Sequence, residues 1–223
     1  MVELYRDFQF ADLSPPLLAR VLRERPELLT DFDWVVLFHR TGDWAWLGRV
    51  KNYEKALMAA AEIGSMAAAQ WAYDMGARGV EWVMRKGAWG GHLTVEKWAW
   101  DHGARDVEWA MEWAAEYGHL EIVKWAWDHG ARNVEEAMER AAGRGHLEIV
   151  KWAYNMSPPE DRAEYVERAM AWAAGMGHLE IVLWAYDMGA RNVEWAMQEA
   201  ASGGHTEVEA WLRARLEEAR LHG

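Results

Sequence analysis

The chain has 223 residues, of which 52% are hydrophobic, so it is too apolar to remain disordered. Its 36 acidic and 24 basic side chains leave a net charge of −12, which disfavours binding to the phosphate backbone of a nucleic acid. The absence of cysteine excludes disulfides and thiolate metal sites.

The first seven residues, Met1 to Asp7, lack the basic flank and apolar run of a signal peptide. No apolar run in the chain approaches the ~18 residues that a membrane helix needs. We therefore expect a water-soluble cytoplasmic protein without a membrane partner.

Residues 1–52 do not share the pattern of the rest and are predicted to form an N-terminal helical cap. Ser14-Pro15-Pro16 predicts the start of a helix through Leu17–Arg25, because proline is tolerated in a first helical turn. Asp33–Arg40 and Trp44–Val50, separated by Gly42, predict a degenerate first helix pair.

From Tyr53 onward a unit of about 27 residues recurs six times, marked by Gly-His-Leu or a variant of it. The predicted repeats are 53–79, 80–106, 107–133, 134–165, 166–192 and 193–219. The last repeat is expected to continue as a C-terminal capping helix to about residue 221.

Each unit has the pattern of two short helices. In VEWAMEWAAEYGHLEIVKWAWDHGARN, small apolar residues such as Ala110 and Ala114 have helical spacing, and Gly118 suits the end of the first helix. Asp106, Asn133 and Asn192 are predicted N-caps. One such pair cannot bury its apolar face alone. The sequence therefore predicts an all-α protein, an α-solenoid of stacked helix–turn–helix repeats with no sheet.

The fourth unit differs from its neighbours by five additional residues, within the segment Asn155–Arg162. This segment contains Pro158 and Pro159, so we expect a longer, stiff loop there. It is either a tolerated insertion or a contact element.

Three segments, AAEYGHLEIVKWAWDHGA, AAGRGHLEIVKWAY and AAGMGHLEIVLWAYDMGA, resemble the ankyrin repeat. The similarity rests on Ala-Ala-x-x-Gly-His-Leu-Glu-Ile-Val with a later Gly-Ala, and it extends in degenerate form over residues 53–219. Trp109-Ala110-Met111-Glu112 replaces the family's usual Thr-Pro-Leu-His opening. The unit is also shorter than the usual length of about 33 residues, which leaves little chain for the projecting β-turn finger.

Shortened units of this kind are similar to those in ankyrin-like proteins of large DNA viruses. The resemblance implies an ankyrin-like helix stack that serves as a protein-binding scaffold without catalysis, in the cytoplasm of a host cell if the origin is viral.

The repeat histidines are predicted to be structural residues of the turn between the two helices. Equivalent residues of stacked repeats lie on the order of 10 Å apart, too far to share a metal ion. His102 and His129 are predicted to be surface residues near the ends of second helices. The chain has no HExxH, GxSxG or P-loop motif, so we expect no metal, no cofactor and no enzymatic activity. The repeat histidines are His92, His119, His146, His178 and His205.

The chain has 17 tryptophans, of which the 14 in the repeats form two groups. One position of the second helix carries Trp in all six repeats, and an aromatic residue often follows two positions later. We interpret these two columns as packing between repeats, because large rings would compensate for the alanine-rich first helices. The first column is Trp71, Trp98, Trp125, Trp152, Trp184 and Trp211, and the second is Tyr73, Trp100, Trp127, Tyr154 and Tyr186.

The other tryptophans of the repeats form an irregular stripe with charged residues on the first helices, opposite the alanine face. Exposed Trp together with Arg is typical of interface hot spots, so this stripe predicts a partner-binding concave surface. The alternative is that these rings simply cover the alanine-rich surface. The predicted partner-binding residues are Trp82, Arg85, Lys86, Trp89, Trp109, Glu112, Trp113, Glu116, Arg140, Arg168, Trp172 and Trp195.

The leading hypothesis is therefore a non-catalytic scaffold, monomeric, for an unidentified protein partner. A second hypothesis is an adaptor, because Phe10–Leu18 with Val21-Leu22 and Pro26–Leu29 resembles an F-box, which would recruit a ubiquitin ligase. A third is a structural or engineered solenoid that associates with itself.

Overall fold

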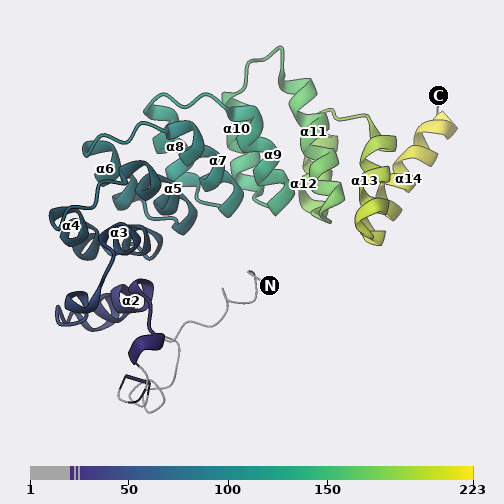
Figure 1. Ribbon diagram of the computed structural model, residues 1–223. Coiled ribbons are helices and arrows are strands. Elements are labelled where there is room, and N and C mark those ends of the chain that lie inside the picture. The colour runs from purple at the N-terminus through teal and green to yellow at the C-terminus, as the bar shows by residue number, and fades with distance from the viewer. Residues whose placement is uncertain (1–20, 23, 25, 223) are drawn as a thin grey trace. The chain divides into compact units, whose positions relative to one another are not determined.

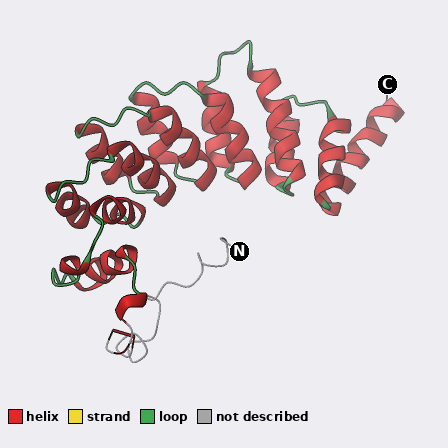
Figure 2. Cartoon of the chain, in the orientation of Figure 1, coloured by secondary structure: helices red, strands yellow, loops and turns green. Residues whose placement is uncertain are grey.

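The computed structural model describes residues 21–222 with the exception of residues 23 and 25. Within this part of the chain there are thirteen α-helices and no strand. The all-α fold without a sheet is as predicted (Figure 2). None of these described helices is both long enough and apolar enough to cross a membrane. Most of the predicted helix over Leu17–Arg25 and most of the F-box-like segment lie outside the described residues, but Val21, Leu22 and Glu24 are described and are helical.

The chain divides into two compact units, residues 1–105 (unit 1) and 106–223 (unit 2). In unit 1, α3 packs against α4 and α5 against α6, while α2 and α5 both contact α3. The helices of unit 1 are the 3₁₀ helix η3 (Pro26–Leu28), α2 (Asp31–Thr41), the 3₁₀ helix η4 (Leu47–Arg49), α3 (Tyr53–Glu62), α4 (Met66–Asp74), α5 (Val80–Gly90) and α6 (Leu93–Asp101).

Unit 2 contains four helix pairs in chain order (Figure 1). The first helices α7, α9, α11 and α13 pack in succession, and each second helix contacts the second helix of the next pair. The helices are α7 (Val107–Tyr117), α8 (Leu120–Asp128), α9 (Val134–Arg144), α10 (Leu147–Met156), α11 (Arg162–Gly175), α12 (Leu179–Asp187), α13 (Val193–Gly203) and α14 (Thr206–His222).

Small residues let the helices of a pair approach closely. On α7, Ala110, Ala114 and Ala115 are fully buried, and so is Ala126 on α8, the helix that packs against α7. Gly118 ends α7 with φ of 86°, a left-handed conformation that favours glycine. A Cβ atom on Gly118 would lie 2.7 Å from the ring of His146 in the next pair, so the glycine is also required by packing.

The predicted N-caps are only partly correct. Asn192 accepts a hydrogen bond from the backbone N–H of Trp195, whereas Asp106 and Asn133 make no side-chain cap. The first-turn glutamate of the preceding first helix instead holds this loop: Glu108 accepts the backbone N–H groups of Arg132 and Asn133 at 3.0–3.1 Å. Equivalent bonds join Glu54 to Arg78 and Gly79, Glu81 to Arg105, and Glu167 to Arg191 and Asn192.

The arginine of the Gly-Ala-Arg sequence closes the second helix. Arg132 donates from Nη1 to the carbonyls of Trp127 and Ala131, and its guanidinium lies 4.4 Å from the centre of the Trp127 ring. These bonds add to the contacts of carbonyl groups at the end of the helix, where the regular helical bonds stop; the Trp127 carbonyl also accepts the backbone N–H of Gly130. The same arrangement recurs at Arg78, Arg105 and Arg191.

The two second-helix aromatic columns pack against each other between repeats, as predicted. Trp127 meets Trp152 edge to face at 5.9 Å, and Tyr154 meets Trp184 in the same way at 5.6 Å. Tyr73–Trp98 and Tyr186–Trp211 are further pairs of this kind. Such contacts add about 0.5–1.5 kcal/mol each beyond the burial of apolar area.

Histidines of the Gly-His-Leu turn bind the preceding first helix, which confirms their structural role for the described contacts. His146 Nε2 lies 3.1 Å from the carbonyl oxygen of Glu116, and His92 and His178 make equivalent bonds to Glu62 and Gly143. His102 is not a simple surface residue: its ring is half-buried and stacks on Trp98, and His129 packs on Trp125 in the same position.

The prediction of a longer loop in the fourth repeat is wrong. The connection from α10 to α11 covers residues 157–161, the same length as the connection between α8 and α9 at residues 129–133. The additional residues mostly lengthen the helices, since α11 has 14 residues against 11 in α7. Ser157 caps α10 through its hydroxyl to Ala153, and Arg162 lies over the Tyr154 ring in place of the missing Gly-Ala-Arg.

The predicted first helix pair is also incomplete. Asp33–Arg40 lies within α2, which Thr30 caps in a reciprocal capping box with Asp33. The second member is only the 3₁₀ helix η4, whose neighbour Trp46 stacks on Trp34.

Candidate functional site

In unit 1, the predicted binding residues lie on α5. Trp82 is exposed, and the Arg85 guanidinium lies 5.0 Å from the centre of its ring. Lys86 lies 4.3 Å from the centre of the Trp89 ring and also pairs with Glu62 on α3 at 3.0 Å. Both cations therefore already contact aromatic or acidic groups of the same unit.

In unit 2, three rings stack along α7. Trp113 lies between Trp109 and Tyr117, with centre distances of 6.1 and 5.8 Å and nearly parallel planes. These residues are four apart, so helical geometry places them on one side of α7. Trp109 is exposed, whereas Trp113 is half-buried. The three rings therefore form one continuous stack along α7, of which Trp109 is an exposed member.

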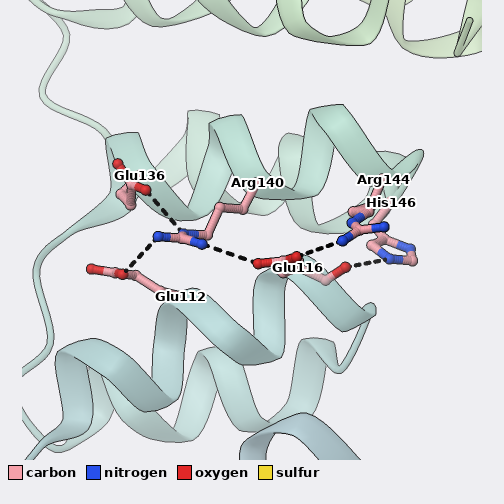
Figure 3. A network of polar contacts seen from close by, with 6 residues as sticks. All are labelled: Glu112, Glu116, Glu136, Arg140, Arg144 and His146. Carbon is pink, nitrogen blue, oxygen red and sulfur yellow. Dashed lines mark hydrogen bonds and ion pairs between the residues drawn. The ribbon is translucent and has the colours of Figure 1, made fainter. Parts of the chain in front are cut away.

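Arg140 on α9 is the centre of a network of charges (Figure 3). It forms ion pairs with Glu136 on the same helix at 2.9 Å, and with Glu116 and Glu112 on α7 at 3.0 and 3.4 Å. Arg144 binds the second oxygen of Glu116 at 2.7 Å. The network therefore joins α7 to α9, and Arg140 is not available as an isolated positive charge.

Burial and neighbouring charges act in opposite directions on the carboxylates of this network. Burial alone would raise the pKa of Glu116, but hydrogen bonds and charges from Arg144 and Arg140 outweigh burial and lower it. Burial raises the pKa of Glu139, and Arg168 offsets this only in part because Glu136 and Glu135 lie nearby. Burial likewise lowers the pKa of His146, which favours the neutral ring that bonds to Glu116.

Arg168 on α11 is bound in a similar way. It pairs with Glu135 and Glu139 of α9, and with Glu164 one turn earlier on its own helix. Arg140 and Arg168, both predicted partner-binding residues, thus connect three successive first helices. Their first role is structural.

Two cavities lie between the first helices of unit 2 and share Trp172 and Met176. The α9–α11 cavity has a volume of about 360 Å³. Three carboxylates line it, Glu116, Glu136 and Glu139, together with Arg140 and Arg144. The α11–α13 cavity has a volume of about 380 Å³. It is lined by Arg168, Ala171, Trp172, Gly175, Met176, Trp195, Glu199, Ser202 and Gly203.

The side chains at these cavities are unusually exposed for apolar residues. Trp172 is 48% exposed, Met176 53% and Trp195 36%. Trp195 is oriented by a hydrogen bond of 3.1 Å from its indole nitrogen to Glu199. Small residues surround these rings, which leaves room for a ligand beside them. We call the exposed side chains and cavities of α7, α9, α11 and α13 the first-helix face of unit 2.

The predicted site residues thus fall into separate groups. Trp82, Arg85, Lys86 and Trp89 belong to unit 1, and the other eight belong to the first-helix face of unit 2. The sequence interpretation missed Met176 and Arg144. Met176 and Arg144 share one position of the repeat, directly before the glycine of the Gly-His-Leu turn, which Tyr117 holds in the third repeat. This position lies at the end of the first helix, and the contact of Arg144 with Glu116 becomes visible only in the structure.

No three described His, Asp or Glu residues are grouped in a way that could hold a metal ion. Comparison with curated proteins gives no match. A model of the ankyrin-repeat family, described as "Ankyrin repeats (many copies)", matches residues 111–153, from α7 to α10. This central segment is therefore similar to ankyrin repeats, in agreement with the all-α stack of helix pairs.

Proposed function

We propose that the chain is a non-catalytic scaffold that binds a protein partner on the first helices of its repeats. The observation that carries this proposal is the pair of cavities that meet at Trp172 and Met176. Large exposed apolar side chains beside concave, alanine- and glycine-lined surface are typical of interaction sites. Ankyrin repeats, which residues 111–153 resemble, act generally as protein-interaction scaffolds.

The aromatic rings of the second helices differ from Trp172 and Trp195 in their surroundings, and this difference supports the assignment. Their aromatic rings are packed between repeats or lie under arginines of the same chain, so they have a structural use. Trp172 and Trp195 make no equivalent ring pair among the described contacts. Within unit 2 the proposed binding residues are Trp109, Trp113, Trp172 and Trp195, with Glu112, Glu116, Arg140 and Arg168 shaping the surface. On α5 of unit 1, Trp82 and Trp89 form a separate, smaller patch.

The test is selection from a displayed library of random 12-residue peptides. Wild type is compared with Trp172→Ala/Trp195→Ala and with the matched control Leu183→Ala/Met188→Ala, which changes exposed residues at α12. We expect peptides that bind wild type and the control, but not the tryptophan variant. If every selected peptide binds all three folded proteins equally, the site assignment is wrong.

We propose that the chain acts as a monomer. Light scattering over a range of concentrations tests this point, because exposed tryptophans also suit self-association. If the protein forms a concentration-dependent dimer that is absent in Trp172→Ala/Trp195→Ala, these tryptophans bind a second copy of the chain and not an external partner.

A further inference from the structure

The first helices of unit 2 carry a surplus of negative charge. Helices α7, α9, α11 and α13 contain ten glutamates and four arginines, a net charge of −6. The arginines are held within the unit: Arg140, Arg144 and Arg168 pair with glutamates, and Arg162 donates to backbone carbonyls near the end of α10. The surplus charge favours a positively charged partner and repels an acidic one.

Aromatic rings elsewhere in the chain are repeatedly covered by the chain's own cations. Arg132 lies over Trp127, Arg191 over Tyr186 and Arg215 over Trp211. Trp172 is more exposed than these rings, yet the described part of the chain places no arginine or lysine over it. A cation brought by a partner would find at Trp172 the contact that the chain makes internally at the other rings.

Carboxylates lie next to this ring in both cavities. Glu136 and Glu139 line the α9–α11 cavity with Trp172, and Glu199 lines the α11–α13 cavity. Arginines also line these cavities, but they pair with glutamates of the same unit: Arg140, Arg144 and Arg168. A cationic side chain over Trp172 would therefore also approach carboxylates. Met176, common to both cavities, offers an adaptable apolar contact for an adjacent aliphatic side chain.

We propose that the first-helix face of unit 2 binds an extended, arginine- or lysine-rich segment of its partner, with one cationic side chain over Trp172. This inference rests on the proposed scaffold function and narrows it to one partner chemistry. The same negative charge disfavours a nucleic-acid partner, whose phosphate backbone is also negative.

Three fluorescein-labelled 12-residue peptides test the proposal by fluorescence anisotropy. They share a Gly/Ser/Leu background and carry four arginines, four glutamines or four glutamates at the same positions. We expect the arginine peptide to bind at least about tenfold more tightly than the glutamine peptide, with the glutamate peptide weakest. Raising NaCl from about 50 to 300 mM should weaken binding of the arginine peptide, since exposed charges are screened.

Variants locate the contact. Trp172→Ala should weaken binding of the arginine peptide by about 3- to 10-fold. Glu136→Gln/Glu199→Gln should reduce the preference for arginine over glutamine, while glutamine at residue 199 can still accept the Trp195 hydrogen bond. Leu183→Ala is the control and should change nothing.

Equal affinity for the arginine and glutamine peptides would overturn the inference. An affinity for the arginine peptide that is unchanged by Trp172→Ala would overturn it as well. Library peptides that depend on Trp172 and Trp195 but are neutral or acidic would overturn it while leaving the scaffold function in place. A library with no peptide dependent on these tryptophans would refute the scaffold site itself.

Discussion

Glu96 on α6 occupies a position at which α8, α10 and α12 have valine. The residue is fully buried, neither carboxylate oxygen has a hydrogen-bond partner in the described structure, and burial raises its pKa to about 9. Gly87 on α5 makes room for it: a Cβ atom there would lie 2.5 Å from Glu96 Oε1. The equivalent residue in α7 is Ala114. In unit 1, Gly87 and Glu96 therefore occupy the two positions that an alanine and a valine occupy in the α7–α8 pair.

This burial predicts a specific dependence of stability on pH. The carboxyl has a pKa near 4.5 when unfolded and about 9 when folded, so between these values the folded state holds one more proton. Its contribution to stability is greatest below pH 4.5 and falls as pH rises toward 9, at up to about 1.4 kcal/mol per pH unit. Glu96→Val should therefore raise the free energy of unfolding in urea, and by more at pH 8 than at pH 5.

Two variants control for this effect. Glu209→Val changes the equivalent position of α14, where the glutamate is only half-buried and pairs with Arg213, so no gain that grows with pH is expected. Gly87→Ala should destabilise the wild-type protein more than it destabilises the Glu96→Val variant, because the added Cβ would meet the Glu96 carboxyl only in the wild-type protein. A gain from Glu96→Val that is the same at both pH values would refute the buried neutral carboxyl.

At the level of helices, the glutamates of the first turn connect neighbouring repeats. Glu108 of α7 binds two backbone N–H groups in the loop before α9, whereas Glu121 of α8 only pairs with exposed Lys124. Removing an acceptor from backbone donors costs more than removing an exposed ion pair. We expect Glu108→Ala to lower the free energy of unfolding by about 1–2 kcal/mol and Glu121→Ala by less than about 0.5. Similar losses, measured by urea denaturation, would contradict this account of the loop.

The two tryptophan groups should also differ in stability. Trp184 of α12 packs edge to face on Tyr154, whereas Trp172 of α11 is 48% exposed. Trp184→Ala should cost about 2–4 kcal/mol because it removes a ring packed between repeats. Trp172→Ala should stay within about 0.5 kcal/mol of wild type. Thermal unfolding followed by circular dichroism distinguishes the two, and a reversed order would mean that the groups were assigned wrongly.

The sequence predicts the helices well because the repeat shows each boundary several times. The glycine that ends α7 and the aromatic columns recur at one spacing, so their roles follow from comparison between units. The N-caps are predicted only in part. Asp106 and Asn133 make no side-chain cap, and the loop before the helix is held instead by a glutamate about 24 residues earlier in the chain. The loop of the fourth repeat was mispredicted because added residues can lengthen helices instead.

The candidate site is less predictable for a similar reason. Exposed tryptophans were identified because their positions vary while the packing positions do not. The pairing of Arg140 and Arg168 with glutamates of neighbouring helices depends on side-chain directions that spacing alone does not define. Met176 lines both cavities, yet its position in the repeat carries Tyr117 and Arg144 in other units, so the residue type does not mark it as part of a site.

At the level of the whole molecule, the chain combines a net charge of −12 with 17 tryptophans. Second-helix rings are used for packing between repeats, and exposed rings on the first helices of unit 2 are proposed to bind a partner. This separation of stability from binding is the central claim. It is independent of how the two units are arranged, because each group of contacts lies within one unit.

The most direct test is the affinity of the arginine peptide for Trp172→Ala and for Trp184→Ala, both measured at a temperature where circular dichroism shows each variant to be folded. The account predicts binding weakened about 3- to 10-fold by Trp172→Ala and unchanged by Trp184→Ala. Binding lost in Trp184→Ala but retained in Trp172→Ala would contradict it.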